Sequence, residues 1–337
     1  MKYMRRIVIL FLLSMMLTAC QDKDSAETEE PTDTTEQEDE EKVDEDLGEK
    51  ENEKEQVADG EIESGKGGFL WRVDNGDTTV YLQGTVHLGT EDFYPFNEKI
   101  EQAYEEADIV VPEVDIADAD LMEDMELSVK MGMYMDGTTI EDHVSEEVYA
   151  KLEEVFSEYN LPMEIVETFK PWMLESLITQ LVAEELDYMH GVDMYFLERA
   201  KEDNKEIIEL ETAAEQLEVL SGQSDAFQER QLEETLDTID AFGEMMKELF
   251  VVYLDGDEDA LLDMLFPEEE ETDEEYEEYM VALNDDRNVN MAEKIEGFLE
   301  DEKGKTYFVI VGTAHLVLDP HIRTLLEEEG YNVERVY

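Results

Sequence analysis

The chain has 337 residues, of which 94 are acidic and 24 are lysine or arginine, so its formal net charge at pH 7 is −70. A surface this negative repels the phosphates of nucleic acids, which excludes nucleic-acid binding as the function. The single cysteine excludes an intrachain disulfide.

The first twenty residues have the pattern of a lipoprotein signal. Three basic residues precede an apolar stretch over residues 7–17, and Leu17-Thr18-Ala19-Cys20 follows. This pattern predicts export, cleavage before Cys20 and lipid attachment to Cys20, which would anchor the mature protein to the extracytoplasmic face of the cell membrane. The alternative is an ordinary cleaved signal with an incidental cysteine. The apolar stretch is shorter than the roughly 20 residues that a membrane-spanning helix needs.

Residues 21–66 contain almost nothing that could be buried, and Glu, Asp, Thr, Gln, Ser and Lys dominate them. We expect this segment to be a disordered, acidic tether. The folded domain is then predicted over residues 67–337, which is long enough for one large core. Two acidic runs, residues 255–259 and 268–271, lack the ligand spacing of a calcium-binding loop and are expected to be solvated loops.

Strands are predicted at the start of the domain. Residues 69–73 and 78–83 flank Asp74-Asn75-Gly76-Asp77, which is a favourable hairpin turn. A helix is expected over residues 97–106, because apolar residues recur there at helical spacing, and a third strand over residues 109–113.

The middle of the chain is predicted to be helical. We expect helices over residues 145–159, 163–188 with an interruption at Pro171, 192–203, 225–254 and 274–299, with one strand over residues 205–210. A strand over 307–311, a helix over 320–329 and a strand over 332–336 complete the chain. These elements predict an α/β (α+β) domain, with a central mixed sheet built from its two ends and a large inserted helical region.

One motif occurs twice, each time after a predicted strand: Gly84-Thr85-Val86-His87-Leu88 and Gly312-Thr313-Ala314-His315-Leu316. A glycine at the end of a strand allows a sharp turn, so Gly84 and Gly312 would let each histidine project over the edge of the sheet. Glu113 ends a third apolar run in the same way. Two imidazoles and one carboxylate would bind zinc, manganese or cobalt with one position left for water. The alternative is that the histidines only bond backbone carbonyls at the strand ends.

The remaining three histidines are not expected to bind metal. His190 precedes a glycine and is expected at a helix C-terminus. His143 lies among acidic residues and His321 in the first turn of a predicted helix, so both are expected at the surface.

Several short motifs together resemble the TraB/GumN family, and their order and spacing cover essentially the whole predicted domain. The motifs are the two Gly-Thr-x-His sequences, Val111-Pro112-Glu113-Val114-Asp115, Lys170-Pro171-Trp172-Met173, Gly191-Val192-Asp193, Leu210-Glu211-Thr212 and Arg287-Asn288. The family includes the Tiki proteases and is related in fold to ChaN-like haem-binding lipoproteins and to erythromycin esterases. The resemblance implies a divalent-metal-dependent hydrolase whose site contains both motif histidines and the strand-end glutamate.

Carried onto this chain, the resemblance makes His87 and His315 metal ligands and Glu113 a ligand or general base. Glu211 is our candidate for a second carboxylate that accepts a proton from a metal-bound water. Arg287 and Asn288 are candidates for stabilising an oxyanion. The alternative for Glu211 and Arg287 is a helix cap or a surface ion pair.

The sequence therefore predicts a lipid-anchored, extracytoplasmic, divalent-metal-dependent hydrolase, best described as a peptidase that acts on peptides or extended protein segments near the membrane. Two alternatives stay open. One is a non-enzymatic lipoprotein that sequesters a peptide pheromone, haem or a metal. The other is an esterase-type hydrolase that uses the same histidines and glutamate without a metal.

Overall fold

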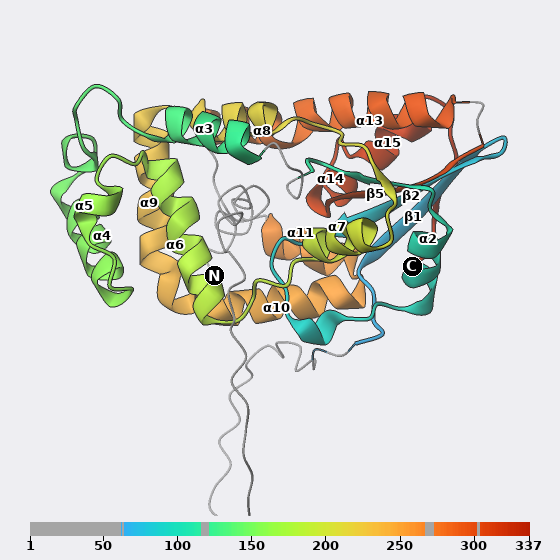
Figure 1. Cartoon of the computed structure of the whole chain (residues 1–337), viewed down its shortest axis with the longest axis horizontal. Coiled ribbons are helices and arrows are strands. Elements are labelled where there is room, and N and C mark those ends of the chain that lie inside the picture. Colours follow the sequence, from blue (N-terminus) through green and yellow to red (C-terminus); the bar gives the residue numbers. More distant parts are fainter. Residues whose placement is uncertain (1–61, 63, 116–120, 267–272, 302–303) are drawn as a thin grey trace, which may run out of the picture.

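A computed structural model describes residues 62, 64–115, 121–266, 273–301 and 304–337. The predicted signal, Cys20 and nearly all of the predicted tether lie outside the described residues. The described part of the chain forms a mixed α/β structure around one six-stranded sheet with strand order β4-β3-β5-β2-β1-β6 (Figure 1). The strands are β1 Phe69–Asn75, β2 Thr78–Thr85, β3 Ile109–Pro112, β4 Glu206–Ile207, β5 Thr306–Gly312 and β6 Val333–Arg335.

The two ends of the domain meet in the middle of this sheet. Strands β1 and β2 form the predicted antiparallel hairpin, which turns between Asn75 and Thr78, and Gly76 at the turn has φ = +61°. Strand β5 inserts between β2 and β3 and is parallel to both. The prediction of a mixed sheet built from both ends is therefore confirmed.

Helices fill the rest of the described chain. They are α2 Glu98–Glu106, α3 Leu121–Gly132, α4 Glu146–Glu158, α5 Met163–Val166, α6 Pro171–Glu185, α7 Val192–Glu202, α8 Ala213–Ser221, α9 Asp225–Thr238, α10 Phe242–Asp255, α11 Glu258–Leu265, α12 Glu274–Met280, α13 Asp286–Leu299, α14 Ala314–Val317 and α15 Ile322–Glu328. In Figure 1, α3, α8 and α13 run along one side of the molecule and α10 along the opposite side, while α4, α5, α6 and α9 form the end away from the sheet.

Three predicted elements differ from the structure. Pro171 does not kink a long helix but starts α6 at a position where its missing N–H is no loss. The segment 274–299 is not one regular helix, because a π-helical turn, Val281–Asp285, separates α12 from α13. The strand predicted over residues 205–210 shortens to β4, although the backbone beyond it still bonds to the end of β3.

Most buried apolar side chains belong to one cluster that covers both faces of the sheet. A smaller cluster, which includes Trp172, Phe227 and Tyr279, joins α6, α9 and α12. At the α6–α9 contact the carboxyl of Glu175 is buried, and the hydroxyl of Thr235 donates to it at 2.8 Å. None of the described helices combines the length and apolar character needed to span a bilayer.

Candidate functional site

The carboxyl ends of three parallel strands bring the predicted residues to one edge of the sheet. Thr85 at the end of β2 pairs with Gly312 at the end of β5, and Pro112 at the end of β3 pairs with Ile310. His87, His315 and Glu113 follow these strand ends, and all three side chains are buried. The structure therefore brings the three predicted metal-site residues to the same edge.

The two repeated motifs pack directly against each other. Both the backbone N–H and the hydroxyl of Thr313 donate to the carbonyl of Thr85, each at 2.9 Å. A Cβ atom at Gly84 would lie 2.9 Å from the Thr313 hydroxyl. Glycine at position 84 is thus required by this close approach, and not by the sharp turn that we expected, because Gly84 does not have a positive φ.

His87 is oriented by an aspartate on α7. Nδ1 of His87 lies 2.6 Å from Oδ2 of Asp193, and both side chains are buried. With Asp193 ionised, Nδ1 carries the proton and donates it, which leaves Nε2 as the ring nitrogen with a lone pair. A carboxylate in this position is the common partner of metal-binding histidines.

His315 is oriented by Asn288 on α13. The Asn288 amide group donates to the carbonyl of Pro320 at 2.8 Å, so its Oδ1 faces Nδ1 of His315 at 2.7 Å. Nδ1 must therefore be the donor, and Nε2 carries the lone pair. Burial lowers the pKa of His315 to about 3, and the charge of Arg287 lowers it further against the opposing effect of Glu113. His315 is thus neutral at physiological pH.

Nε2 of His315 is a buried atom without a hydrogen-bond partner among the described residues. It lies 3.7 Å from Oε1 of Glu113, which is too long for a hydrogen bond. His87 lies close enough for its charge to influence the pKa values of both Glu113 and His315. The two nitrogen lone pairs and one carboxylate oxygen are accordingly the atoms available to a cation here.

Glu113 and Glu211 share one buried guanidinium. Nη2 of Arg287 donates to Glu113 at 2.7 Å and to Glu211 at 2.6 Å, and Nε of Arg287 contacts both oxygens of Glu211 at 3.0 Å. The amide of Gln216 on α8 also donates to both carboxylates, at 3.1 and 3.3 Å. Two carboxylates against one guanidinium leave this group with a net charge of −1.

The charges in this group reinforce one another. Burial alone would raise the pKa of Glu113, but Arg287, then His315 and His87, and a 2.6 Å bond from the Gly312 N–H hold it below its ordinary value. Burial opposes the charge of Arg287, yet Glu113 and Glu211 raise the pKa of its guanidinium above the ordinary value. Glu113 therefore stays ionised at neutral pH, as a metal ligand or a proton acceptor requires.

The donor set fits a divalent metal. Zinc binds imidazole nitrogen and carboxylate oxygen at about 2.0–2.2 Å, so two atoms 3.7 Å apart, Nε2 of His315 and Oε1 of Glu113, can bind the same ion. As the side chains stand, no group of three or more His, Cys, Asp or Glu residues in the described ranges is arranged to hold a metal. Closing such a site requires the His87 ring to approach the other two.

Arg287 and Asn288 are engaged differently from the predicted oxyanion role. The Arg287 guanidinium contacts Glu113, Glu211 and, through Nη1 at 3.2 Å, the carbonyl of Leu283. The Asn288 amide hydrogens point to Pro320. These contacts favour positioning roles, Arg287 for the two carboxylates and Asn288 for His315.

Two residues of this site, Asp193 and Gln216, were not singled out from the sequence. Asp193 stands in a recognisable motif, but an aspartate in the first turn of a helix is also favoured by the helix dipole. Gln216 lies on α8, which the sequence did not predict.

The other histidines lie outside this group. His190 lies in the loop before α7 and not at a helix C-terminus, His143 stacks on Tyr134, and His321 caps α15.

The profile of the TraB/PrgY/gumN family matches residues 69–335. Two curated proteins, each described as "Uncharacterized protein YbaP", from Escherichia coli (strain K12) and Shigella flexneri, are 24% identical to this chain over 140 residues. These matches cover 41% of this chain and 50% of each relative, so they extend over about half the length of those proteins. No solved structure matches the chain with significance.

Proposed function

Because this chain belongs to the TraB/PrgY/gumN family, we propose that it is a divalent-metal-dependent hydrolase that acts on peptides or extended protein segments. His87, His315 and Glu113 would hold manganese, cobalt or zinc. The observation that carries this proposal is the state of His315, which is neutral, oriented by Asn288 and buried with Nε2 lacking a hydrogen-bond partner among the described residues.

A histidine with a purely structural role would not be expected in this state. A buried polar atom without a partner costs about 1–3 kcal/mol, and proteins rarely retain such a cost without a use. The lone pair of Nε2 faces the oxygen of an ionised carboxylate, which also needs a positive partner. A metal ion would satisfy both atoms at once.

When bound, the metal would polarise the scissile carbonyl and lower the pKa of a bound water toward neutrality. The chain's own residues would supply orientation and a proton acceptor. Asp193 and Asn288 fix the two imidazole rings, and Arg287 keeps Glu113 ionised so that Glu113 can bind the ion or accept a proton. Glu211, which faces three contacts from Arg287, is better suited to hold the guanidinium than to accept a proton.

One observation favours a second candidate, a metal-free hydrolase that uses the same histidines and Glu113. The guanidinium of Arg287 lies 2.7 Å from Glu113 and already neutralises part of its charge. A cation at the same carboxylate would be repelled by Arg287. In this version His87, held by Asp193, would act as the general base.

Elemental analysis combined with an activity assay separates the two candidates. Full-length protein would be purified with its lipid anchor in detergent, stripped with chelator, reloaded with manganese, cobalt or zinc, and tested on a quenched-fluorescence peptide library. We expect about one metal per chain, activity only after reloading, and loss of both in His315→Ala and Glu113→Gln. His190→Ala is the matched control, because its ring contacts only exposed carboxylates. A stripped enzyme with full activity would refute the metal mechanism and favour the second candidate.

If the wild-type protein binds a peptide or a metal but hydrolyses nothing, the sequestering alternative would replace both hydrolase proposals.

We further propose that the protein is anchored by a lipid on Cys20 at the extracytoplasmic face of the cell membrane. The support is the pattern of residues 1–20. Cys20→Ser should abolish metabolic labelling with a radioactive fatty acid and leave an unprocessed or released protein. A Cys20→Ser variant that is processed and retained by the membrane like the wild type would contradict this localisation.

A further inference from the structure

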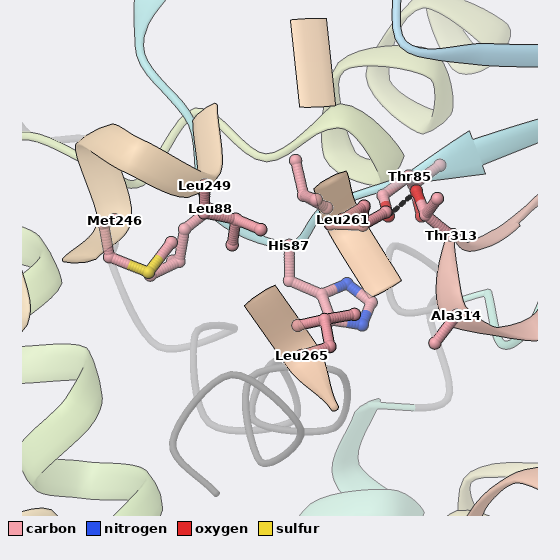
Figure 2. A pocket seen from close by; sticks show the side chains of 10 residues that line it. Thr85, His87, Leu88, Met246, Leu249, Leu261, Leu265, Thr313 and Ala314 are labelled. Carbon is pink, nitrogen blue, oxygen red and sulfur yellow. Dashed lines mark hydrogen bonds between the residues drawn. The ribbon is translucent and has the colours of Figure 1, made fainter. Parts of the chain in front are cut away.

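A small cavity adjoins the candidate metal site on its apolar side. It has a volume of about 30 Å³ and is bounded by both repeated motifs and by helices α10 and α11 (Figure 2). Figure 2 shows the His87 side chain projecting among Leu88, Leu261 and Leu265. The cavity therefore shares one wall, His87, with the proposed metal ligands.

The walls of this cavity are almost entirely hydrocarbon. Met246 and Leu249 from α10 and Leu261 and Leu265 from α11 are all buried, and Ala314 closes the side next to His315. The hydroxyl of Thr313, which could have made the wall polar, is already bonded to the Thr85 carbonyl. A charged or amide side chain would lose its hydration here without a replacement, whereas an apolar group would not.

We infer that this cavity is a specificity pocket that receives one short aliphatic side chain of the substrate, such as that of leucine or valine, and thereby places the adjacent peptide bond at His87, His315 and Glu113. This inference rests on the proposed function. A volume of about 30 Å³ holds roughly two water molecules. A branched aliphatic side chain suits that scale, whereas an aromatic ring or a long acyl chain does not.

Leu265 is the best position at which to change the pocket. It lies at the C-terminal end of α11 and contacts none of the charged residues around Arg287 through any hydrogen bond. Leu265→Ala should enlarge the pocket, and Leu265→Phe should fill it. Leu152→Ala on α4 is a matched control, because Leu152 is equally buried but is not part of the pocket.

The test uses full-length protein and a peptide series that differs only at one residue next to the scissile bond: alanine, valine, leucine, phenylalanine or aspartate. We expect the wild type to prefer leucine over phenylalanine by about 10–200-fold in kcat/KM, the range that one or a few methylene groups give in a hydrophobic pocket. Leu265→Ala should reverse the preference toward phenylalanine, and Leu265→Phe should lower kcat/KM for leucine but much less for alanine. Identical leucine-to-phenylalanine ratios in the wild type, Leu265→Ala and Leu152→Ala would overturn the inference.

Failure of the proposed function would be visible separately. If the wild type cleaves no peptide with any metal, the hydrolase proposal fails, and the pocket is then tested by binding of the same peptides, measured by isothermal titration calorimetry. The same reversal of preference in Leu265→Ala would support the pocket without hydrolysis. Binding that does not discriminate between leucine, phenylalanine and aspartate would overturn it.

Discussion

Glu175 provides a quantitative test of the structure, because its carboxyl is buried between α6 and α9 without a positive partner. Burial raises its pKa to about 8, the nearby charge of Glu234 raises it slightly, and the hydrogen bond from Thr235 only partly opposes burial. The folded protein therefore binds a proton at Glu175 that the unfolded chain releases near pH 4.5. This group contributes stability below its unfolded pKa and loses that contribution as pH rises through about 8.

The size of the effect follows from the shift. Each pH unit between the unfolded and folded pKa values costs about 1.4 kcal/mol, so the penalty at pH 7 is about 3 kcal/mol. Glu175→Gln removes the ionisation and keeps an oxygen for Thr235, at a cost of about 1 kcal/mol for the added amide hydrogens. We therefore expect the variant to be about 1–3 kcal/mol more stable than the wild type at pH 8, and equal or less stable at pH 5.

Urea unfolding at pH 5, 7 and 8 measures this difference, and Glu154→Gln on the exposed face of α4 is the control. The control should change the free energy of unfolding by less than about 0.5 kcal/mol at each pH. If the difference between Glu175→Gln and the wild type changes by less than about 1 kcal/mol from pH 5 to pH 8, the carboxyl of Glu175 is not buried as described.

Three further predictions concern the candidate site. Arg287→Met should lower the free energy of unfolding by about 3–5 kcal/mol in urea melts, because it leaves two buried carboxylates unpaired, whereas Arg72→Met, which breaks an exposed pair with Asp74, should cost about 0–1 kcal/mol; equal losses would contradict the buried network. Asn288→Ala should weaken metal affinity about 10–100-fold in competition titrations with a fluorescent chelator, and unchanged affinity would show that Asn288 does not orient His315. Gly84→Ala should destabilise by about 1–3 kcal/mol, because the new methyl group would lie 2.9 Å from the Thr313 hydroxyl, whereas Gly297→Ala in α13, with no atom within 4 Å, should be neutral or stabilising in the same thermal melts.

The sequence predicted the parts of this fold that depend on local patterns. The hairpin of β1 and β2 follows from two apolar runs around Asn75-Gly76, and the start of α4 from Ser145, which caps it as expected. The position of β5 between β2 and β3 was not predicted, because partners that are distant in sequence leave no local signal. The break between α12 and α13 was also missed, since the helical spacing of apolar residues continues through the π-helical turn.

The site was predicted to a similar depth. Strand ends of a parallel sheet lie at one edge, so the convergence of His87, Glu113 and His315 followed from the order of apolar runs. The pairing of Arg287 with both carboxylates did not follow, because α13 reaches the strand ends only through tertiary packing. Sequence patterns thus gave the residues that end strands, whereas the residues that orient them required the structure.

The central place of β5 has a consequence for how the protein folds. The contact between Thr85 and Thr313 joins positions 228 residues apart, so the middle of the sheet cannot form until the chain closes a very long loop. Closing such a loop costs conformational entropy before any contact offsets it, and folds dominated by distant contacts form slowly. Until β5 arrives, β2 and β3 present unpaired edges to solvent. Assembly of the sheet and assembly of the candidate site are therefore the same late step of folding.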